Sequence, residues 1–312
     1  MREAPMVPQA TPDSYYGRPI LKQPTWKTPD VPLYLFLGGL AGASSVLAEG
    51  AALTGRPELE RVARVAAGAG AGLGTVALIH DLHRPERFLN MLRVFKPTSP
   101  LSVGSWVLAP FGTLSGASAA SAVTGWLPRA GRVAGAGAAA LGPALATYTG
   151  ALLANTAVPA WHEAHRELPY VFAGSGATAA GGLACMLVPP AQAGPARRML
   201  AAGALMELAA AERVTHRLGL VSEPYQQGRP GRLMRTARVL TALGGSAALV
   251  AGRRSRTVSV VAGAACVAAS VMTRFGVFEA GLASARDPRY VVEPQRARLR
   301  ARHEEAAATM AR

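Results

Sequence analysis

Polar and aromatic side chains lie near the ends of four consecutive apolar runs in the first half of this sequence. If the first run starts at one face of a membrane, the second ends there, the third starts there and the fourth ends there. The side chains that this places together are Tyr34, His80, Asp81, Trp106, Tyr148 and Asn155. Such groups can hydrogen-bond the two carbonyl oxygens of a planar head group, with His80 and Asp81 as proton donors or orienting groups. Hydrogen bonds between helices are the plainer alternative for Tyr148, Asn155 and His80.

Four of the ionisable residues inside the apolar runs are candidates for function, because a charge there is costly. Glu49 lies late in the first run and Glu207 midway along the sixth. Because each helical residue advances by a fixed rise, Glu212 and Arg274 come to similar depths on the sixth and eighth runs. We expect them to form an ion pair that holds the second half together. Glu207 has no cation at its depth and is either a protonated hydrogen-bonding group or part of a proton relay.

The charge distribution along the 312 residues indicates a membrane protein. Half of the residues are hydrophobic and 16% are charged, whereas about a quarter are charged in a soluble domain. Lys and Arg number 33 against 18 acidic residues, a net charge of +15, and they lie almost entirely between the apolar runs and in the tails. Basic loops are typical of membrane topology, so this net charge does not indicate nucleic-acid binding.

Eight apolar runs, separated by Pro and Gly, predict eight transmembrane helices. They cover residues 31–53, 62–80, 102–126, 132–155, 168–189, 197–217, 237–251 and 256–279. The segment Tyr34–Gly38 has an echo in Tyr170–Gly174, and the same offset carries His80 onto His216. We therefore expect an all-α integral membrane protein whose eight helices form two parallel-related four-helix bundles.

The layout has four parts. Residues 1–30 form a polar, Pro-rich N-terminal tail, and residues 281–312 form a charged C-terminal tail. The first bundle covers residues 31–158 and the second covers residues 159–280.

A basic loop follows the second predicted helix. Phe88, Leu92 and Phe95 repeat there at helical spacing, which predicts an amphipathic helix at the membrane surface. Two roles are open for it: docking of a partner subunit, or anchoring to lipid alone. Its cations are Arg84, Arg87, Arg93 and Lys96.

The residue types that hold metal cofactors are scarce. The two cysteines, Cys185 and Cys266, both lie inside apolar runs, and an iron–sulfur cluster normally needs four. A membrane haem usually needs two histidines at matching depth on facing helices, and none of the six histidines lies midway along a run. We expect neither haem nor an iron–sulfur cluster in this chain, and no metal site.

Four segments carry a resemblance to a known family: 32–42, 81–88, 102–106 and 148–156. They resemble the NrfD/PsrC family, the membrane subunits of polysulfide-reductase-like and formate-dehydrogenase-like molybdoenzymes. The most specific match is the Asp-Leu-x-Arg-Pro-x-Arg-Phe sequence that starts at Asp81.

The resemblance implies an eight-helix, haem-free membrane anchor that binds menaquinone or ubiquinone. It implies two partners, a ferredoxin-like iron–sulfur subunit and a molybdopterin catalytic subunit, and electron transfer between them and the quinone pool, as in anaerobic respiration. Tyr148 matches the family's quinone-contacting tyrosine on the fourth helix. At the start of the first helix this sequence offers Tyr34 and no Asn/His pair.

A membrane transporter of ions or small solutes is the alternative function, because duplicated helical bundles with buried Glu and Arg also suit transport. That function predicts helices broken at the middle of the membrane, whereas most prolines here fall in loops, Pro110 and Pro143 excepted.

Sidedness follows from the loop charges. The face with both tails and the second, fourth and sixth loops carries 22 Lys and Arg, the other face carries 10, and Arg274 completes the 33. The positive-inside rule places both termini in the cytoplasm, in a multi-pass protein of the cytoplasmic (inner) cell membrane.

Overall fold

The computed structural model describes residues 20–82 and 84–310, and no β-strand occurs among them. The predicted all-helical class is confirmed for this part of the chain. Its helices, with two 3₁₀ segments (η), are α1 (Asp30–Leu53), α2 (Pro57–Asp81), η2 (Pro85–Leu92), α3 (Pro100–Thr124), α4 (Pro128–Ala154), α5 (Pro159–Glu163), α6 (Leu168–Leu187), α7 (Gly194–Arg217), η3 (Gly219–Tyr225), α8 (Gly228–Val250), α9 (Arg256–Arg286) and α10 (Arg289–Met310).

Proline and serine define where several helices begin. Four helices, α2 to α5, have proline as their first residue, where its fixed φ suits a helix and its missing N–H is not needed. The Ser99 side chain caps α3 by accepting the Ser102 backbone N–H, and Ser255 caps α9 in the same way. Both α3 and α4 continue through their internal prolines, Pro110 and Pro143.

Six helices of the described chain are long and apolar enough to cross a membrane: α1, α2, α3, α4, α6 and α9. With 24 and 23 residues, α7 and α8 are of similar length, but charged residues lower their hydropathy. The prediction that the seventh span starts at residue 237 is wrong, because α8 already begins at Gly228 and carries four arginines in its first three turns. The last long helix also extends beyond residue 279, to Arg286.

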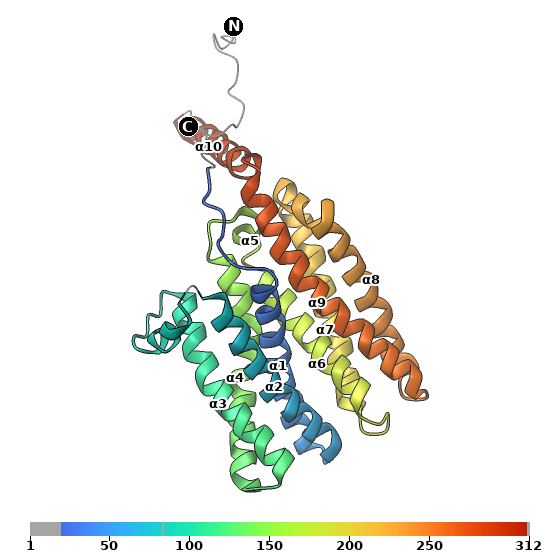
Figure 1. Ribbon diagram of the computed structural model, residues 1–312. Coiled ribbons are helices and arrows are strands. Elements are labelled where there is room, and N and C mark those ends of the chain that lie inside the picture. The colour runs from blue at the N-terminus through green and yellow to red at the C-terminus, as the bar shows by residue number, and fades with distance from the viewer. Residues whose placement is uncertain (1–19, 83, 311–312) are drawn as a thin grey trace.

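The long helices pack in the same sequence in each half of the chain (Figure 1). In the first half α1 packs on α2, α2 on α3, α3 on α4, and α4 on α1. In the second half the corresponding contacts join α6, α7, α8 and α9 in a ring. The halves meet where α6 contacts α1 and α4, and where α9 contacts α1.

Glycine allows the closest helix crossings. At the α1–α6 crossing a Cβ added to Gly176 would lie 2.7 Å from the Gly39 carbonyl oxygen, and at the α1–α4 crossing one added to Gly42 would lie 2.4 Å from that of Gly142. Within lipid such small residues permit the close backbone packing that joins helices.

The described parts of both tails pack at the end of the molecule where α5 lies (Figure 1). From the N-terminal tail, the Gln23 side-chain amide donates to the Ala285 carbonyl at 2.8 Å, and the Trp26 ring stacks on Trp161 at 5.6 Å. The charged C-terminal tail is largely the helix α10, in which Arg298 pairs with Glu163 of α5. Residues 1–19 of the predicted N-terminal tail lie outside the described residues.

Candidate functional site

A pair of tyrosines joins α1 to α4. The Tyr34 hydroxyl donates to the Tyr148 hydroxyl over 3.1 Å. Tyr34 is 3% exposed and Tyr148 is half-buried. A tyrosine carries one hydroxyl hydrogen, and among the described residues no protein acceptor receives that of Tyr148. The half-buried phenol of Tyr148 is therefore available to donate to a bound group.

A glycine of α3 makes room for the Tyr148 ring. A Cβ added to Gly104 would lie 2.0 Å from two ring carbons of Tyr148 and 2.3 Å from its hydroxyl oxygen. The next residue, Ser105, hydrogen-bonds the Ser102 carbonyl and, at 3.4 Å, the Met91 carbonyl of η2. The Tyr148 ring thus packs beside the residue of α3 that contacts the basic loop.

Two of the predicted residues form a polar rim at the end of α2. The imidazole of His80 contacts the Asp30 carboxylate at 2.9 Å, and the His80 side chain is 75% exposed. Asp81 accepts the Lys27 backbone N–H at 2.9 Å, and the Lys27 ammonium donates to the His80 carbonyl. His80 and Asp81 are thereby held in place at the end of α2, with the His80 side chain open to solvent.

The other two predicted residues make no direct contact with the tyrosine pair. Asn155 follows the last residue of α4, where its backbone N–H donates to Ala151 and its side chain is exposed. Trp106 is 42% exposed and meets the Phe95 ring edge-on at 5.8 Å. Asn155 lies beyond Tyr148 at the end of α4, and Trp106 lies close to Gly104 near the start of α3.

The predicted ion pair between Glu212 and Arg274 is wrong. Glu212 is half exposed and contacts His216 at 2.9 Å and Arg238 at 3.3 Å. Arg274 is fully buried and donates to the carbonyls of Leu35 on α1 and Phe172 on α6. Similar depth did not bring the two together because the helices present them in different directions.

Glu207 lies in the buried centre of the second half. It is 4% exposed, and its Oε1 accepts the Thr273 hydroxyl at 2.7 Å, while Oε2 meets no partner among the described residues. Glu207 is therefore a buried hydrogen-bonding group, and its partner Thr273 precedes Arg274 in the sequence. Glu49, near the other end of α1, is half-buried.

The basic loop does contain a helix, as predicted, but a shorter one than the spacing of its apolar residues indicated. It contains the 3₁₀ helix η2, which stops at Leu92, before Phe95. The Ser102 hydroxyl donates to the Val94 carbonyl and accepts the Lys96 backbone N–H, so the chain turns back onto α3. The four cations of the loop are all exposed: Arg84, Arg87, Arg93 and Lys96.

Three residues of this site were not predicted: Asp30, Lys27 and Gly104. An acidic residue at the start of the first helix, opposite His80 at the end of the second, was a usable signal for Asp30. The Lys27 contacts depend on the path of an irregular segment, for which a sequence gives no rule. Gly104 lies within one of the resemblance segments, but only the structure shows that its missing side chain makes room for the Tyr148 ring.

The fold and its apolar helices define a multi-pass helical membrane protein. The family described as polysulphide reductase, NrfD, matches residues 21–214, more than half of the chain and every element of the tyrosine site. The chain belongs to this family, which confirms the resemblance. No curated protein matches it. Membership indicates a membrane subunit of a respiratory oxidoreductase, in a family that typically pairs with iron–sulfur and molybdoenzyme subunits.

Proposed function

We propose that this chain is the quinone-reacting subunit of its complex, passing electrons between the quinone pool and an iron–sulfur partner. The observation that carries the proposal is the hydroxyl of Tyr148, which accepts from Tyr34 and keeps its own hydrogen free in a half-buried position. That arrangement suits a carbonyl oxygen, and menaquinone and ubiquinone each present two.

A bound quinone would supply the redox chemistry, the uptake or release of two electrons and two protons. Tyr148 would donate to one carbonyl oxygen, and Tyr34 would fix the direction of that donation. A fixed donor in a site that excludes water stabilises developing negative charge more than water does. His80, with Asp30 behind it, and Asp81 would exchange protons with the solvent at the rim.

Asn155 and Trp106 complete the proposed site at its outer edge. Both are exposed at the ends of helices that carry the inner residues. For a proton relay deeper in the molecule, Glu207 is the stronger candidate, because one carboxylate oxygen has no partner among the described residues. Glu49 is the second candidate.

The proposed partners are a ferredoxin-like iron–sulfur subunit and a molybdopterin catalytic subunit. The exposed cations of the basic loop suit an acidic surface on the iron–sulfur partner. The same loop contacts Ser105 through the Met91 carbonyl, and Ser105 follows Gly104, against which the Tyr148 ring packs. Docking there would bring a metal cluster towards the quinone.

We propose further that α7 and α8 also cross the membrane, so that each ring of four helices is one bundle. The termini, η2, α5 and η3 would then share one face. Loop charge places that face in the cytoplasm of a cell whose inner membrane holds the protein. The uninterrupted course of α3 and α4 through Pro110 and Pro143 does not favour the transporter alternative, which needs broken helices.

The test is Tyr148→Phe in the assembled complex. Quinone-linked turnover should fall by about tenfold or more, because a donor to a developing oxyanion is lost, while transfer to an artificial acceptor at the iron–sulfur subunit is kept. The matched control is Tyr170→Phe, which removes the same hydroxyl from the residue that echoes Tyr34 but is 60% exposed. Full quinone turnover by an assembled Tyr148→Phe complex would reject the site.

A further inference from the structure

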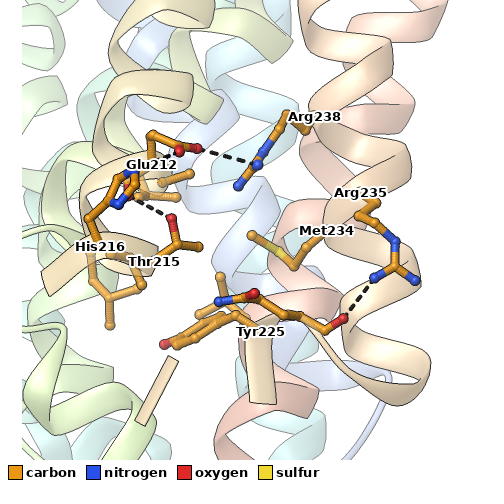
Figure 2. A pocket seen from close by; sticks show the side chains of 13 residues that line it. Glu212, Thr215, His216, Tyr225, Met234, Arg235 and Arg238 are labelled. Carbon is orange, nitrogen blue, oxygen red and sulfur yellow. Dashed lines mark hydrogen bonds and ion pairs between the residues drawn. The ribbon is translucent and has the colours of Figure 1, made fainter. Parts of the chain in front are cut away.

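A cavity in the second half uses none of the residues of the quinone site. It has a volume of about 440 Å³ and lies between α7 and α8, with η3 at one end (Figure 2). Its floor is apolar and includes Leu168, Val171 and Val277. At the η3 end, Tyr225 is 5% exposed and donates to the Ala160 carbonyl, and burial raises the pKa of this phenol. Tyr225 is therefore a neutral residue of the cavity wall, and its hydroxyl hydrogen is already used in a hydrogen bond.

The rim of this cavity is basic. Figure 2 shows Arg238 of α8 reaching across the opening to Glu212 of α7, while Arg235 lies one turn earlier on α8 and points towards the Gln226 carbonyl. Glu212 neutralises one arginine, Arg238, at 3.3 Å and also contacts His216. Arg235 donates one N–H to the Gln226 carbonyl and has no carboxylate partner among the described residues. A guanidinium has five N–H donors, so both arginines keep donors for an anion, and the site has a net positive charge.

The outer surface of α8 continues from this rim as an apolar stripe. Val239 and Leu243 follow Arg235 at intervals of four residues, which places all three on one side of the helix. They are 53% and 66% exposed, respectively. Within the described chain, α8 packs mainly on α9 and α7, and the exposure of Val239 and Leu243 shows that this side faces outwards. Basic first turns followed by exposed aliphatic side chains match the headgroup and acyl layers of a membrane.

We propose that the α7–α8 cavity binds an anionic phospholipid. Arg235 and Arg238 donate to the phosphodiester, with Glu212 orienting Arg238. One acyl chain enters the cavity over its apolar floor, and another lies along Val239 and Leu243. Charge complementarity selects an anionic lipid over a zwitterionic one, whose ammonium group would meet the arginines. The proposal requires only that the protein lies in a membrane and is independent of the quinone site.

The test is lipid retention by the purified chain in detergent, measured by native mass spectrometry with phosphatidylglycerol or phosphatidylcholine added. The unmodified chain should retain phosphatidylglycerol preferentially. Arg235→Gln with Arg238→Gln should reduce that retention about tenfold or more, the effect of losing charge-assisted hydrogen bonds. Arg253→Gln with Arg254→Gln is the control, because it removes the same charge from exposed positions at the other end of α8.

A second variant separates lipid binding from folding. Ala211→Trp fills the cavity and leaves every charge in place, so it should also weaken retention of phosphatidylglycerol. In phosphatidylcholine nanodiscs, both variants should have the melting temperature of the unmodified chain. Phosphatidylglycerol nanodiscs should raise the melting temperature of the unmodified chain but not that of either variant. Retention of the lipid by both variants would overturn the proposal. Displacement of the lipid by millimolar inorganic phosphate would overturn it in favour of a phosphate-ion site.

Discussion

Gly104→Ala adds one methyl group at the point where α3 meets the Tyr148 ring. That methyl carbon would lie 2.0 Å from ring carbons Cε2 and Cζ, whereas ordinary contact begins near 3.4 Å. The ring must therefore move by the difference between these two distances. Because the clash is with the outer end of a side chain, Tyr148 can move without unfolding the helix pair.

Such a movement is large compared with the tolerance of a hydrogen bond. The Tyr34–Tyr148 contact is already 3.1 Å long, and O–H···O bonds weaken beyond about 3.0 Å. A misplacement of about 1 Å at a reacting centre can lower a rate by about 100-fold. We expect Gly104→Ala to reduce quinone-linked turnover by about 10- to 100-fold, with assembly of the complex unchanged.

Two glycines of the same helix provide the controls. Gly112 and Gly116 have nothing within 4 Å of an added Cβ, so alanine there should leave turnover intact and favour the helix by up to about 1 kcal/mol. The assay compares quinol-coupled turnover with transfer to an artificial acceptor, at equal amounts of co-purified partner. Normal turnover in assembled Gly104→Ala complex would show that the position of the Tyr148 hydroxyl does not control the reaction.

Three further predictions concern docking, sidedness and stability. Arg84→Glu with Arg87→Glu should release the iron–sulfur partner in a pull-down, whereas Arg253→Glu with Arg254→Glu should not; a stoichiometric complex in both would leave the loop a lipid anchor. A C-terminal fluorescent-protein fusion should be bright and the equivalent alkaline-phosphatase fusion inactive, and the reverse pattern would place the termini outside. Arg274→Met should lower stability by about 1.5 kcal/mol, because two charge-assisted hydrogen bonds contribute about 4.5 kcal/mol together, against an insertion cost of about 3 kcal/mol; an unchanged melting temperature in detergent would contradict this.

The order and type of the helices could be predicted because the apolar runs are bounded by residues that stop helices. The predicted start of the seventh helix was late because arginines at its first turns resemble a loop. If α8 crosses the membrane, as proposed, those side chains extend into the headgroup layer while the backbone stays helical. Basic composition therefore marks the membrane edge more reliably than the helix end.

Side-chain direction was the part that depth alone could not predict. Glu207 and Glu212 are five positions apart, which is about 140° around a helix. One therefore points into the bundle, where Thr273 binds it, and the other points outwards to Arg238. Arg274 donates to neither carboxylate but to the Leu35 and Phe172 carbonyls, because the rotation of α9 about its axis directs it towards α1 and α6.

The internal echo and the tyrosine pair together indicate that the two halves have different tasks. The ends of α7 follow the corresponding ends of α2 at nearly the same offset as the one that carries His80 onto His216. The tyrosine pair is not repeated in the second half. Tyr170, which corresponds to Tyr34, is exposed, whereas Tyr34 is buried. The residue that corresponds to Tyr148 is Ser284, which hydrogen-bonds backbone groups. The second half therefore lacks the paired phenols and instead sends Arg274 across to the backbone of α1 at Leu35, the residue after Tyr34. By fixing the helix that carries Tyr34, the second half would hold the proposed quinone site in position, and the residues proposed to contact the quinone all lie in the first half.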